Sequence, residues 1–305
     1  MLEIDGDGKE MSDTAIIGAG PAGISAAMQL ARYEIYPFVY EAAAPGGLLF
    51  NAGMIENYPG FPKGIEGPEL AALFAAGLKN SEAVVCPEEV LSVDYGAGVF
   101  RVTAGSEADF SRLIVATGTR PVSLDSVEYD DPNTEKDIDY GIGMIRTVAG
   151  KSVAVVGAGD AAFDYALTLS KKNDIVILQR GEKPRCNEAL KRRVAGSERI
   201  TVLENASVEI ISREEDGRFA LSLCGAGCGS TNRMTADHVI AAIGRVPREI
   251  ALLPGLSDNF DELVAGGRLR FAGDVINKLH RQTSIAVGDG VRSAMEIYEG
   301  KGLDG

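Results

Sequence analysis

Residues 14–23 read TAIIGAGPAG, in which a short apolar run meets Gly18, Gly20 and Gly23 at G-x-G-x-x-G spacing. A second apolar run, over residues 24–32, follows at once and predicts a helix. The order strand, tight turn, helix is typical of a dinucleotide-binding unit. The first glycine permits the turn, the second lets the backbone approach a pyrophosphate, and the third lets helix and strand pack closely. The alternative is a βαβ unit whose glycines serve packing alone.

An acidic residue at the end of the next predicted strand favours nucleotide binding. The strand over residues 37–40 is followed by Glu41, roughly 20 residues after Gly18, where an acid suits a ribose 2′-hydroxyl. We therefore predict a dinucleotide site in the first part of the chain.

The length and composition are those of a globular protein with room for two domains. The chain has 305 residues, of which 45% are hydrophobic and 24% are charged. No run approaches about 18 apolar residues without a charge, so no membrane span is expected. Residues 1–10 are acidic and polar and lack the basic and apolar regions of a signal peptide. We expect them to form a flexible N-terminal tail, and we expect the protein to be cytoplasmic.

The net charge of −14 argues against nucleic acid as the main partner, because nucleic-acid binding depends on phosphate neutralisation by Lys and Arg. It also disfavours anionic membrane surfaces. Local basic runs occur over residues 171–172, 180–193 and 278–281, although such runs are usually solvated faces. We therefore expect neither a nucleic-acid partner nor a membrane partner.

The four cysteines do not suggest a disulfide scaffold in a chain of this size and character. They are Cys86, Cys186, Cys224 and Cys228. Cys224 and Cys228 form C-x-x-x-C in a Gly-rich turn, and no C-x-x-C occurs anywhere in the sequence.

Neither a metal site nor a catalytic triad is predicted. His238 and His280 are isolated, and no cluster of His, Cys and Asp has metal-ligand spacing. The acids of residues 125–139 are typical of a solvated surface loop between two domains rather than of paired catalytic carboxylates.

Hydrophobic patterning predicts the remaining elements of the first part. We expect loops over residues 45–62, a helix over 66–79, and strands over 83–93, 99–103 and 113–116.

A second Rossmann unit begins at residue 152, where the sequence reads SVAVVGAGDAA. Gly157 and Gly159 are followed by Ala162 at the third glycine position, an accepted substitution. The elements expected after this turn are a helix over residues 161–170, strands over 175–178, 201–203, 207–212, 219–223, 239–242 and 268–272, and a last helix over 285–298.

These patterns predict an α/β fold with two Rossmann-like, three-layer ββα dinucleotide-binding domains. The closing strand and helix are expected to return to the first unit, which makes that domain discontinuous. We place the first domain at residues 11–118 and 246–305 and the second at residues 119–245. The linkers over residues 119–121 and 245–247 are expected to act as hinges.

Several segments together resemble the low-molecular-weight thioredoxin reductase group of two-dinucleotide-domain flavoproteins. The matching segments, which span nearly the whole chain in family order, are residues 18–23 with Glu41, 46–48, 56–60, 116–118, 157–162, 242–245, 273–275 and 281–282. The resemblance implies that the first domain binds FAD and that the protein is a homodimer.

The resemblance also implies roles for individual residues. Those assigned to FAD are the phosphate turn Gly18, Gly20, Pro21, Ala22 and Gly23, the ribose acid Glu41, the flavin-side residues Gly47, Leu48 and Asn57, Val90 near the adenine, the closing pair Thr117 and Gly118, Gly273 with Asp274 at the ribityl chain, and Arg281 with Gln282 at the isoalloxazine. Acids suit hydroxyls, glycines permit close approach, and amide and guanidinium groups donate to flavin carbonyls. The alternatives are a turn-forming role for Asp274, a surface charge for Arg281 and a cap for Asn57.

A second nucleotide is expected in the second domain. The residues assigned to it are Gly157, Gly159, Asp160, Ala161, Arg180, Arg185, Ile243 and Gly244. The strand that carries an acid in NAD sites ends here in Gln179 and Arg180, and an acid-free, basic end tolerates the 2′-phosphate that Arg grips well. NADPH members of the family carry His-Arg-Arg and a further Arg here, of which Arg180 and Arg185 match two. We therefore predict NADPH as the nucleotide, with NADH as the alternative. The other alternative is that these arginines bind no nucleotide and only form a solvated basic face.

The family's redox-active C-x-x-C is missing. Thioredoxin reductases of this group carry it just before the second Rossmann strand, where one thiol attacks the disulfide and the other exchanges electrons with flavin. The corresponding residues 140–144 read YGIGM. We therefore assign no catalytic side chain and do not expect disulfide reduction by the usual route.

Residues 139–142, 149–153 and 159–167 are similar to the thioredoxin-reductase-like ferredoxin–NADP reductases, which share the scaffold and lack the cysteine pair. We expect no counterpart of the C-terminal extension that those enzymes usually carry. The flavin loop over residues 46–62 looks more like that of thioredoxin reductases, so the sequence is intermediate.

Three functions follow from this comparison. The leading hypothesis is an FAD-dependent oxidoreductase that passes electrons from NADPH to ferredoxin or flavodoxin, with a basic patch at Lys278, His280 and Arg281 offsetting the acidic surface. The second is a disulfide reductase that uses Cys224 and Cys228 as a displaced relay. The third is a non-catalytic flavin or nucleotide sensor, or an electron-transfer subunit.

Overall fold

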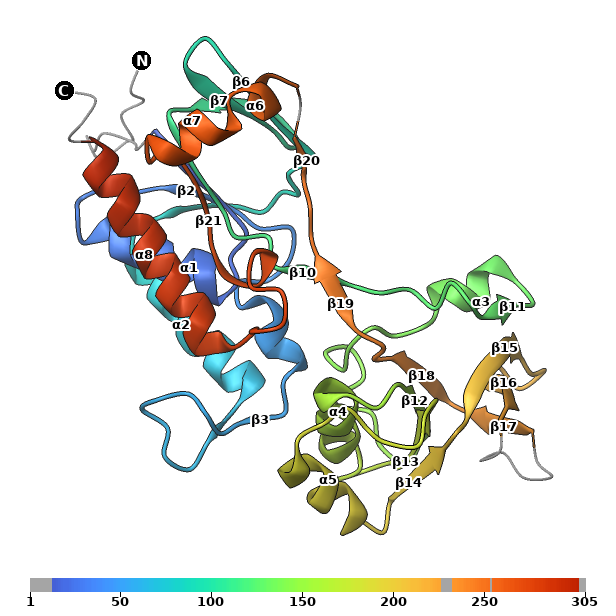
Figure 1. Cartoon of the computed structure of the whole chain (residues 1–305). Helices are drawn as coiled ribbons and strands as arrows, with labels where there is room; N and C mark the ends of the chain where they lie inside the picture. The colour runs from blue at the N-terminus through green and yellow to red at the C-terminus, as the bar shows by residue number, and fades with distance from the viewer. Residues whose placement is uncertain (1–12, 226–231, 253, 302–305) are drawn as a thin grey trace.

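The computed structural model describes residues 13–225, 232–252 and 254–301. Figure 1 shows two lobes joined by a narrow ribbon, which consists of β10 (Thr119–Pro121) and β19 (Arg245–Pro247) paired antiparallel. The predicted tail over residues 1–10 and Cys228 lie outside the described residues. No helix of the described residues is long and apolar enough to cross a membrane.

The first lobe is built on a parallel sheet of order β21-β9-β1-β2-β5. Its strands are β1 (Thr14–Ile17), β2 (Phe38–Tyr40), β5 (Val84–Cys86), β9 (Arg112–Val115) and β21 (Leu269–Phe271). The pairing of β21 with β9 brings the end of the chain back to the first sheet, as predicted for a discontinuous domain. The predicted boundaries of the two domains stay a prediction.

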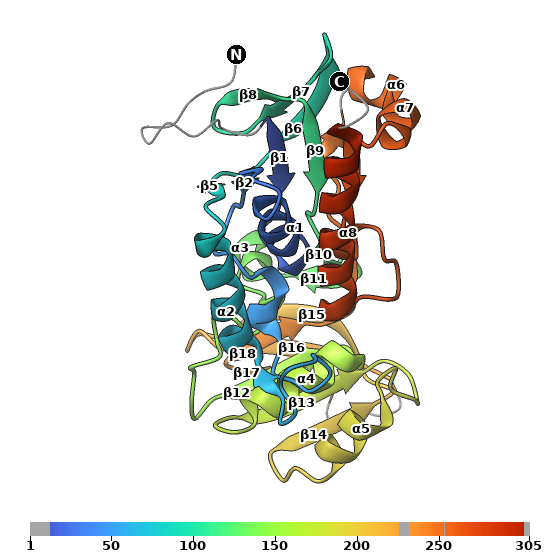
Figure 2. The same ribbon diagram turned by 90° about the vertical axis from the view of Figure 1, so that its left-hand side faces the viewer.

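Three layers follow from the alternation of side chains along each strand. On β1, Ile16 packs with the helices, whereas Ala15 and Ile17 pack with a second sheet on the other face. The helices are α1 (Pro21–Ala31), α2 (Gly67–Asn80) and α8 (Thr283–Lys301), which lie side by side in Figures 1 and 2. The other face carries β6 (Ser92–Gly96), β7 (Val99–Thr103), β8 (Glu107–Phe110) and β20 (Ala251–Leu252), with α6 (Pro254–Asp258) and α7 (Phe260–Ala265).

The second lobe repeats this architecture. Its parallel sheet has the order β14-β13-β12-β18, from β12 (Ser152–Val156), β13 (Asp174–Gln179), β14 (Ile200–Glu204) and β18 (His238–Ala241). One face carries α4 (Asp160–Leu169) and α5 (Glu188–Ala195), and the other carries β11 (Glu128–Tyr129), β15 (Ser207–Arg213), β16 (Phe219–Cys224) and β17 (Arg233–Ala236). Both predicted Rossmann-like units are therefore confirmed.

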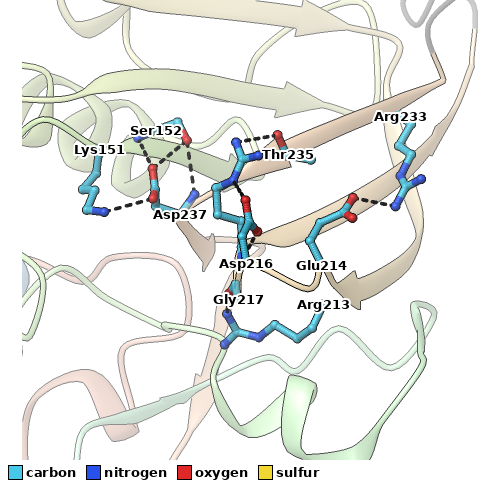
Figure 3. Close-up of polar contacts among 10 residues, drawn as sticks. Lys151, Ser152, Arg213, Glu214, Asp216, Gly217, Arg233, Thr235 and Asp237 are labelled. Atoms are coloured by element: carbon cyan, nitrogen blue, oxygen red, sulfur yellow. Dashed lines mark hydrogen bonds and ion pairs between the residues drawn. The ribbon is translucent and has the colours of Figure 1, made fainter.

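A polar cluster ties the edge of the second parallel sheet together (Figure 3). Asp237, just before β18, accepts hydrogen bonds from the Ser152 amide and hydroxyl, both at 2.9 Å, and from Lys151 Nζ at 3.1 Å. These contacts, the Ser152 amide foremost, lower the pKa of Asp237 to about 2. The carboxylate therefore joins the starts of two neighbouring strands.

Two predicted boundaries were wrong. Residues 83–93 form β5 and β6 with an irregular segment between them rather than one strand, because Pro87 has no amide to donate to a ladder. Residues 125–139 are not a simple loop, since they hold β11, which pairs with β15, and α3 (Pro132–Lys136). Ile138 of this segment is buried. Tertiary pairing explains the ordered structure in this polar stretch.

Short elements were missed. Residues 45–62 were predicted as loops and contain the 3₁₀ helix η1 (Gly47–Asn51) and β3 (Met54–Ile55), which pairs with β4 (Ile65–Glu66). Helix α5 is polar, but its start carries a recognisable signal, because the Asn187 side chain accepts the amides of Ala189 and Leu190 at 3.1 and 3.0 Å.

Candidate functional site

A cavity of about 940 Å³ lies between the lobes and is lined by both. The first lobe contributes the turn after β1, η1, residues 116–118 after β9, and part of the chain around α8. The second lobe contributes the first two turns of α4 and part of α5. Both lobes therefore contribute to the wall of one cavity.

The turn after β1 has the shape that a diphosphate requires. Gly18 has φ +104°, and a side chain there would overlap the carbonyl oxygen of Ala116. Gly20 lines the cavity, and a Cβ added to it would meet nothing within 4 Å. The helix that follows begins at Pro21 with no side-chain cap, so its first amides are available to an anion.

Glu41 is held at the cavity wall by backbone amides. Its Oε2 accepts from the Ala19 amide at 2.7 Å and its Oε1 accepts from the Ala43 amide at 2.9 Å. A carboxylate has further acceptor sites beyond these two bonds. The arrangement fits a ribose that donates its hydroxyls to Glu41.

The opposite end of the cavity is charged. Burial raises the pKa of Asp274, an effect opposed by Arg281 and Arg245. Arg281 donates from Nη1 to the Arg245 carbonyl at 2.8 Å, while its buried Nε has no hydrogen-bond partner among the described residues. Gln282 Oε1 accepts from Asn57 Nδ2 at 2.8 Å. A half-buried acid beside an unused guanidinium donor fits the polar parts of a flavin cofactor.

The cavity gathers most of the predicted residues. Those that line it are Gly18, Gly20, Pro21, Ala22, Glu41, Gly47, Leu48, Asn57, Val90, Thr117, Gly118, Asp160, Ala161, Asp274, Arg281 and Gln282. Those that do not line it are Gly23, Gly157, Gly159, Arg180, Arg185, Ile243, Gly244 and Gly273.

The glycine turn of the second lobe, at residues 157–159, does not line the cavity. Gly157 has φ +123°, and a Cβ there would overlap the carbonyl oxygen of Ala242. Arg185 is brought to this turn by its backbone, which donates to the Ala158 carbonyl at 2.8 Å. Asp160 accepts from the Asn187 amide at 2.7 Å, so its carboxylate also fixes the segment before α5.

Seven charged residues of the cavity wall were missed as site residues from the sequence: Glu56, Glu88, Glu89, Asp164, Arg193, Arg245 and Arg248. Asp164 follows Asp160 by one helical turn, and that spacing on the predicted helix was a usable signal. Arg193 belongs to a helix that was not predicted. Arg248 has no sequence pattern that marks it.

Comparison with known proteins identifies the family. The family model described as "Pyridine nucleotide-disulphide oxidoreductase" matches residues 12–259. The chain belongs to this family. The thioredoxin reductases of Streptomyces clavuligerus and Listeria innocua are each 31% identical to it, over 94% and 92% of this chain and 93% and 91% of theirs.

Solved structures agree. A crystal structure of Lactococcus lactis thioredoxin reductase, described as the FR conformation, matches with a TM-score of 0.81 at 26% identity. That of T. acidophilum thioredoxin reductase matches with a TM-score of 0.79 at 26% identity. Each covers 95% of this chain and 98% of the compared chain. The protein is therefore an oxidoreductase flavoprotein of the thioredoxin reductase type, and the family implies FAD and a nicotinamide nucleotide.

These relatives change the ranking of the predicted acceptors. They are named thioredoxin reductases, which favours the disulfide-reductase alternative over the predicted ferredoxin or flavodoxin. The ferredoxin hypothesis rests on the missing C-x-x-C, whereas the similarity to thioredoxin reductases extends over most of the chain.

Proposed function

We propose that the protein transfers a hydride from NADPH to FAD and passes the electrons to an external acceptor. The observation that carries the proposal is the shared cavity, which one lobe lines with its glycine turn and the other with the first two turns of α4. When bound, FAD takes up the hydride and releases the electrons to the acceptor.

On this proposal the first lobe binds and orients the flavin cofactor. Gly20 and the first amides of α1 would hold its pyrophosphate, and Glu41 would hold the adenosine ribose. Asp274 and Arg281 would hold the ribityl and isoalloxazine parts. Glu41 directly follows β2 and Gly20 directly precedes α1, so regular elements hold these two residues in place.

NADPH is favoured over NADH by the second lobe. Gln179 ends β13 and is buried, and its Nε2 donates to the Gly181 carbonyl at 2.7 Å. A neutral amide at this position does not repel a 2′-phosphate, and the exposed Arg180 and Arg185 attract it.

A disulfide of a thioredoxin-type protein is the first candidate acceptor, because the relatives carry that name. The sequence has no C-x-x-C, so the electrons must leave the flavin directly or through another thiol. Cys224 lies on β16, which does not line the cavity, and Cys228 lies outside the described residues. The displaced relay therefore stays a hypothesis.

Ferredoxin or flavodoxin is the second candidate, favoured by the missing cysteine pair alone. Single-electron release from a flavin suits such a carrier. Homodimerisation, which the family resemblance implies, and a cytoplasmic location both stay predictions. Light scattering of the purified protein tests the first of these.

An anaerobic titration tests the proposal. We expect NADPH to bleach the flavin absorbance of the FAD-loaded protein at lower concentration than NADH does. Absence of bleaching by either nucleotide would overturn it and favour a sensor or an electron-transfer subunit.

A cysteine-free variant, with all four cysteines replaced by serine, separates the acceptors. If a thiol relay operates, this variant retains flavin bleaching and loses thioredoxin reduction. If the acceptor takes electrons directly from flavin, thioredoxin or ferredoxin reduction continues at the original rate.

A further inference from the structure

Residues 141–146, which overlap the segment 140–144 predicted to correspond to the family's cysteine pair, contact the flavin loop (residues 46–62) of the first lobe. The Gly143 amide donates to Asn51 Oδ1 at 3.0 Å. A Cβ added to Gly141 would lie 2.5 Å from Asn51 Oδ1 and 2.6 Å from Asn51 Cγ. A side chain at position 141 would therefore displace Asn51 and break its bond to Gly143.

Helix α4 makes a second contact with the same loop. Asp164 Oδ2 accepts from the Gly53 amide at 2.7 Å, a charge-assisted hydrogen bond. A Cβ added to Gly53 would lie 2.5 Å from Asp164 Oδ1. Gly53 is thus the residue that permits helix and loop to approach this closely.

A third contact lies between these two in sequence. The Arg146 guanidinium donates to the carbonyl of Ala52, and it lies 3.9 Å from a Glu66 carboxylate oxygen. Three consecutive residues of the loop, Asn51, Ala52 and Gly53, therefore each bond to the other lobe. Lobes rotated about the ribbon would lose all three bonds together.

Both sides of this contact are anchored in hydrophobic cores. Ile142 and Ile145 are buried in the core of the second lobe together with Phe163 of α4. In the first lobe, Leu49 of η1 packs with Leu70 of α2. The contact therefore joins two rigid bodies rather than two loose loops.

We propose that Asn51, Ala52 and Gly53, with Gly143, Arg146 and Asp164, form an interlobe clasp that positions α4 over the flavin site for hydride transfer. Its members are positioning residues, because they act on the relative placement of the lobes. Effective hydride transfer requires close placement, and a misplacement of about 1 Å can lower a rate 100-fold. The clasp deepens the proposed function and rests on it only for the hydride-transfer step.

Two ion pairs between exposed side chains of the two lobes contribute less to the interlobe contact. Arg193 bonds to the Glu56 carboxylate at 2.7 and 2.9 Å, and Lys171 lies 3.4 Å from Glu66. These side chains are half exposed, and exposed ion pairs contribute little to stability. The clasp is therefore assigned to the inner contacts alone.

Amide hydrogen exchange of the FAD-loaded protein, without nicotinamide nucleotide, tests the clasp independently of any reaction. In Asp164→Ala we expect exchange about tenfold or more faster at Gly53, and also at Gly143, which Asp164 does not touch. Asp164→Asn keeps an acceptor and is expected to restore much of the protection at both. Unchanged exchange at Gly143 in Asp164→Ala would overturn the clasp, since the contacts would then be independent.

Flavin-reduction kinetics provide the functional test. Gly141→Ala is expected to lower the rate of flavin reduction by saturating NADPH about tenfold or more, with the NADPH dissociation constant nearly unchanged. Gly96→Ala is the matched control, because a Cβ there meets nothing within 4 Å. An unchanged rate in Gly141→Ala would overturn the positioning role. If the unmodified protein is not reduced at all, the proposed function fails while the exchange experiment still decides the clasp.

Discussion

The two lobes use one backbone design with different side chains at the end of an equivalent strand. Gly18 donates its amide to the Tyr40 carbonyl at 2.8 Å, and Gly157 donates to the Leu178 carbonyl at 3.0 Å. The residue after each acceptor is therefore equivalent. This residue is the acid Glu41 in the first lobe and Gln179, which has a neutral amide side chain, in the second.

The environments of these two residues differ as their charges do. Glu41 accepts two backbone amides, whereas Gln179 donates to a backbone carbonyl, and its buried Oε1 has no hydrogen-bond partner among the described residues. The end of β2 thus presents the two acceptor oxygens of a carboxylate, whereas the equivalent end of β13 presents a neutral amide. On the proposed function, this difference in side-chain charge contributes to the choice of nucleotide in each lobe.

Substituting the first glycine of each dinucleotide turn, one lobe at a time, is expected to have the largest effect on cofactor binding. Gly18→Ala forces a side chain into φ +104° and against the Ala116 carbonyl, so we expect FAD content to fall at least about tenfold, with a loss of stability of about 1–3 kcal/mol. Gly157→Ala is expected to retain FAD and lose NADPH binding. Flavin absorbance and NADPH titration measure the two outcomes.

Equal loss of FAD in both variants would contradict separate sites in the two lobes. Gly96→Ala is the control for a harmless added methyl, since its surroundings are open. Thermal unfolding of all three variants separates loss of binding from loss of fold.

Making the second lobe resemble the first sharpens the comparison. Gln179→Glu places a carboxylate where Glu41 stands in the first lobe, so repulsion of the 2′-phosphate is expected to reduce the preference for NADPH over NADH about 10- to 100-fold. The ratio of dissociation constants measures this. Gln179→Met is neutral and of similar size, and it should keep the preference; the same ratio in both variants would exclude a role for charge here.

The polar cluster of Figure 3 provides the smallest expected effect. The pKa of Asp237 is lowered from 3.8 to about 2, chiefly by the Ser152 amide, so its contribution to stability is complete above about pH 4 and lost as the pH falls towards 2. Because the side chain is 22% exposed, we expect Asp237→Asn to cost about 1–2 kcal/mol at pH 7. Urea unfolding at pH 7 and at the lowest pH where the protein stays folded measures the difference.

Asp216→Asn is the matched control in the same lobe, because Asp216 pairs with Arg218 through exposed side chains. If Asp237→Asn lowers the free energy of unfolding by the same amount at both pH values, the hydrogen bonds to Ser152 stabilise the fold independently of the carboxylate charge.

Much of the fold followed from local patterns. The turns at Gly18 and Gly157 were predicted because glycine spacing after an apolar strand is a local signal, and both helices after them form as expected. The return of residues 268–272 to the first sheet was also predicted, and β21 pairs with β9. Helix α5 was missed because its sequence is polar, although Asn187 marks its start.

The sequence by itself determined the two glycine turns, the acid Glu41 and the absence of C-x-x-C, since each is a matter of residue type and spacing. Only the tertiary structure decided that both lobes line one cavity and that Asp164 and Gly143 bond to the flavin loop. These contacts join residues 111 and 92 positions apart in the chain. No local pattern records such a contact, because it exists only when two separately folded cores are brought together.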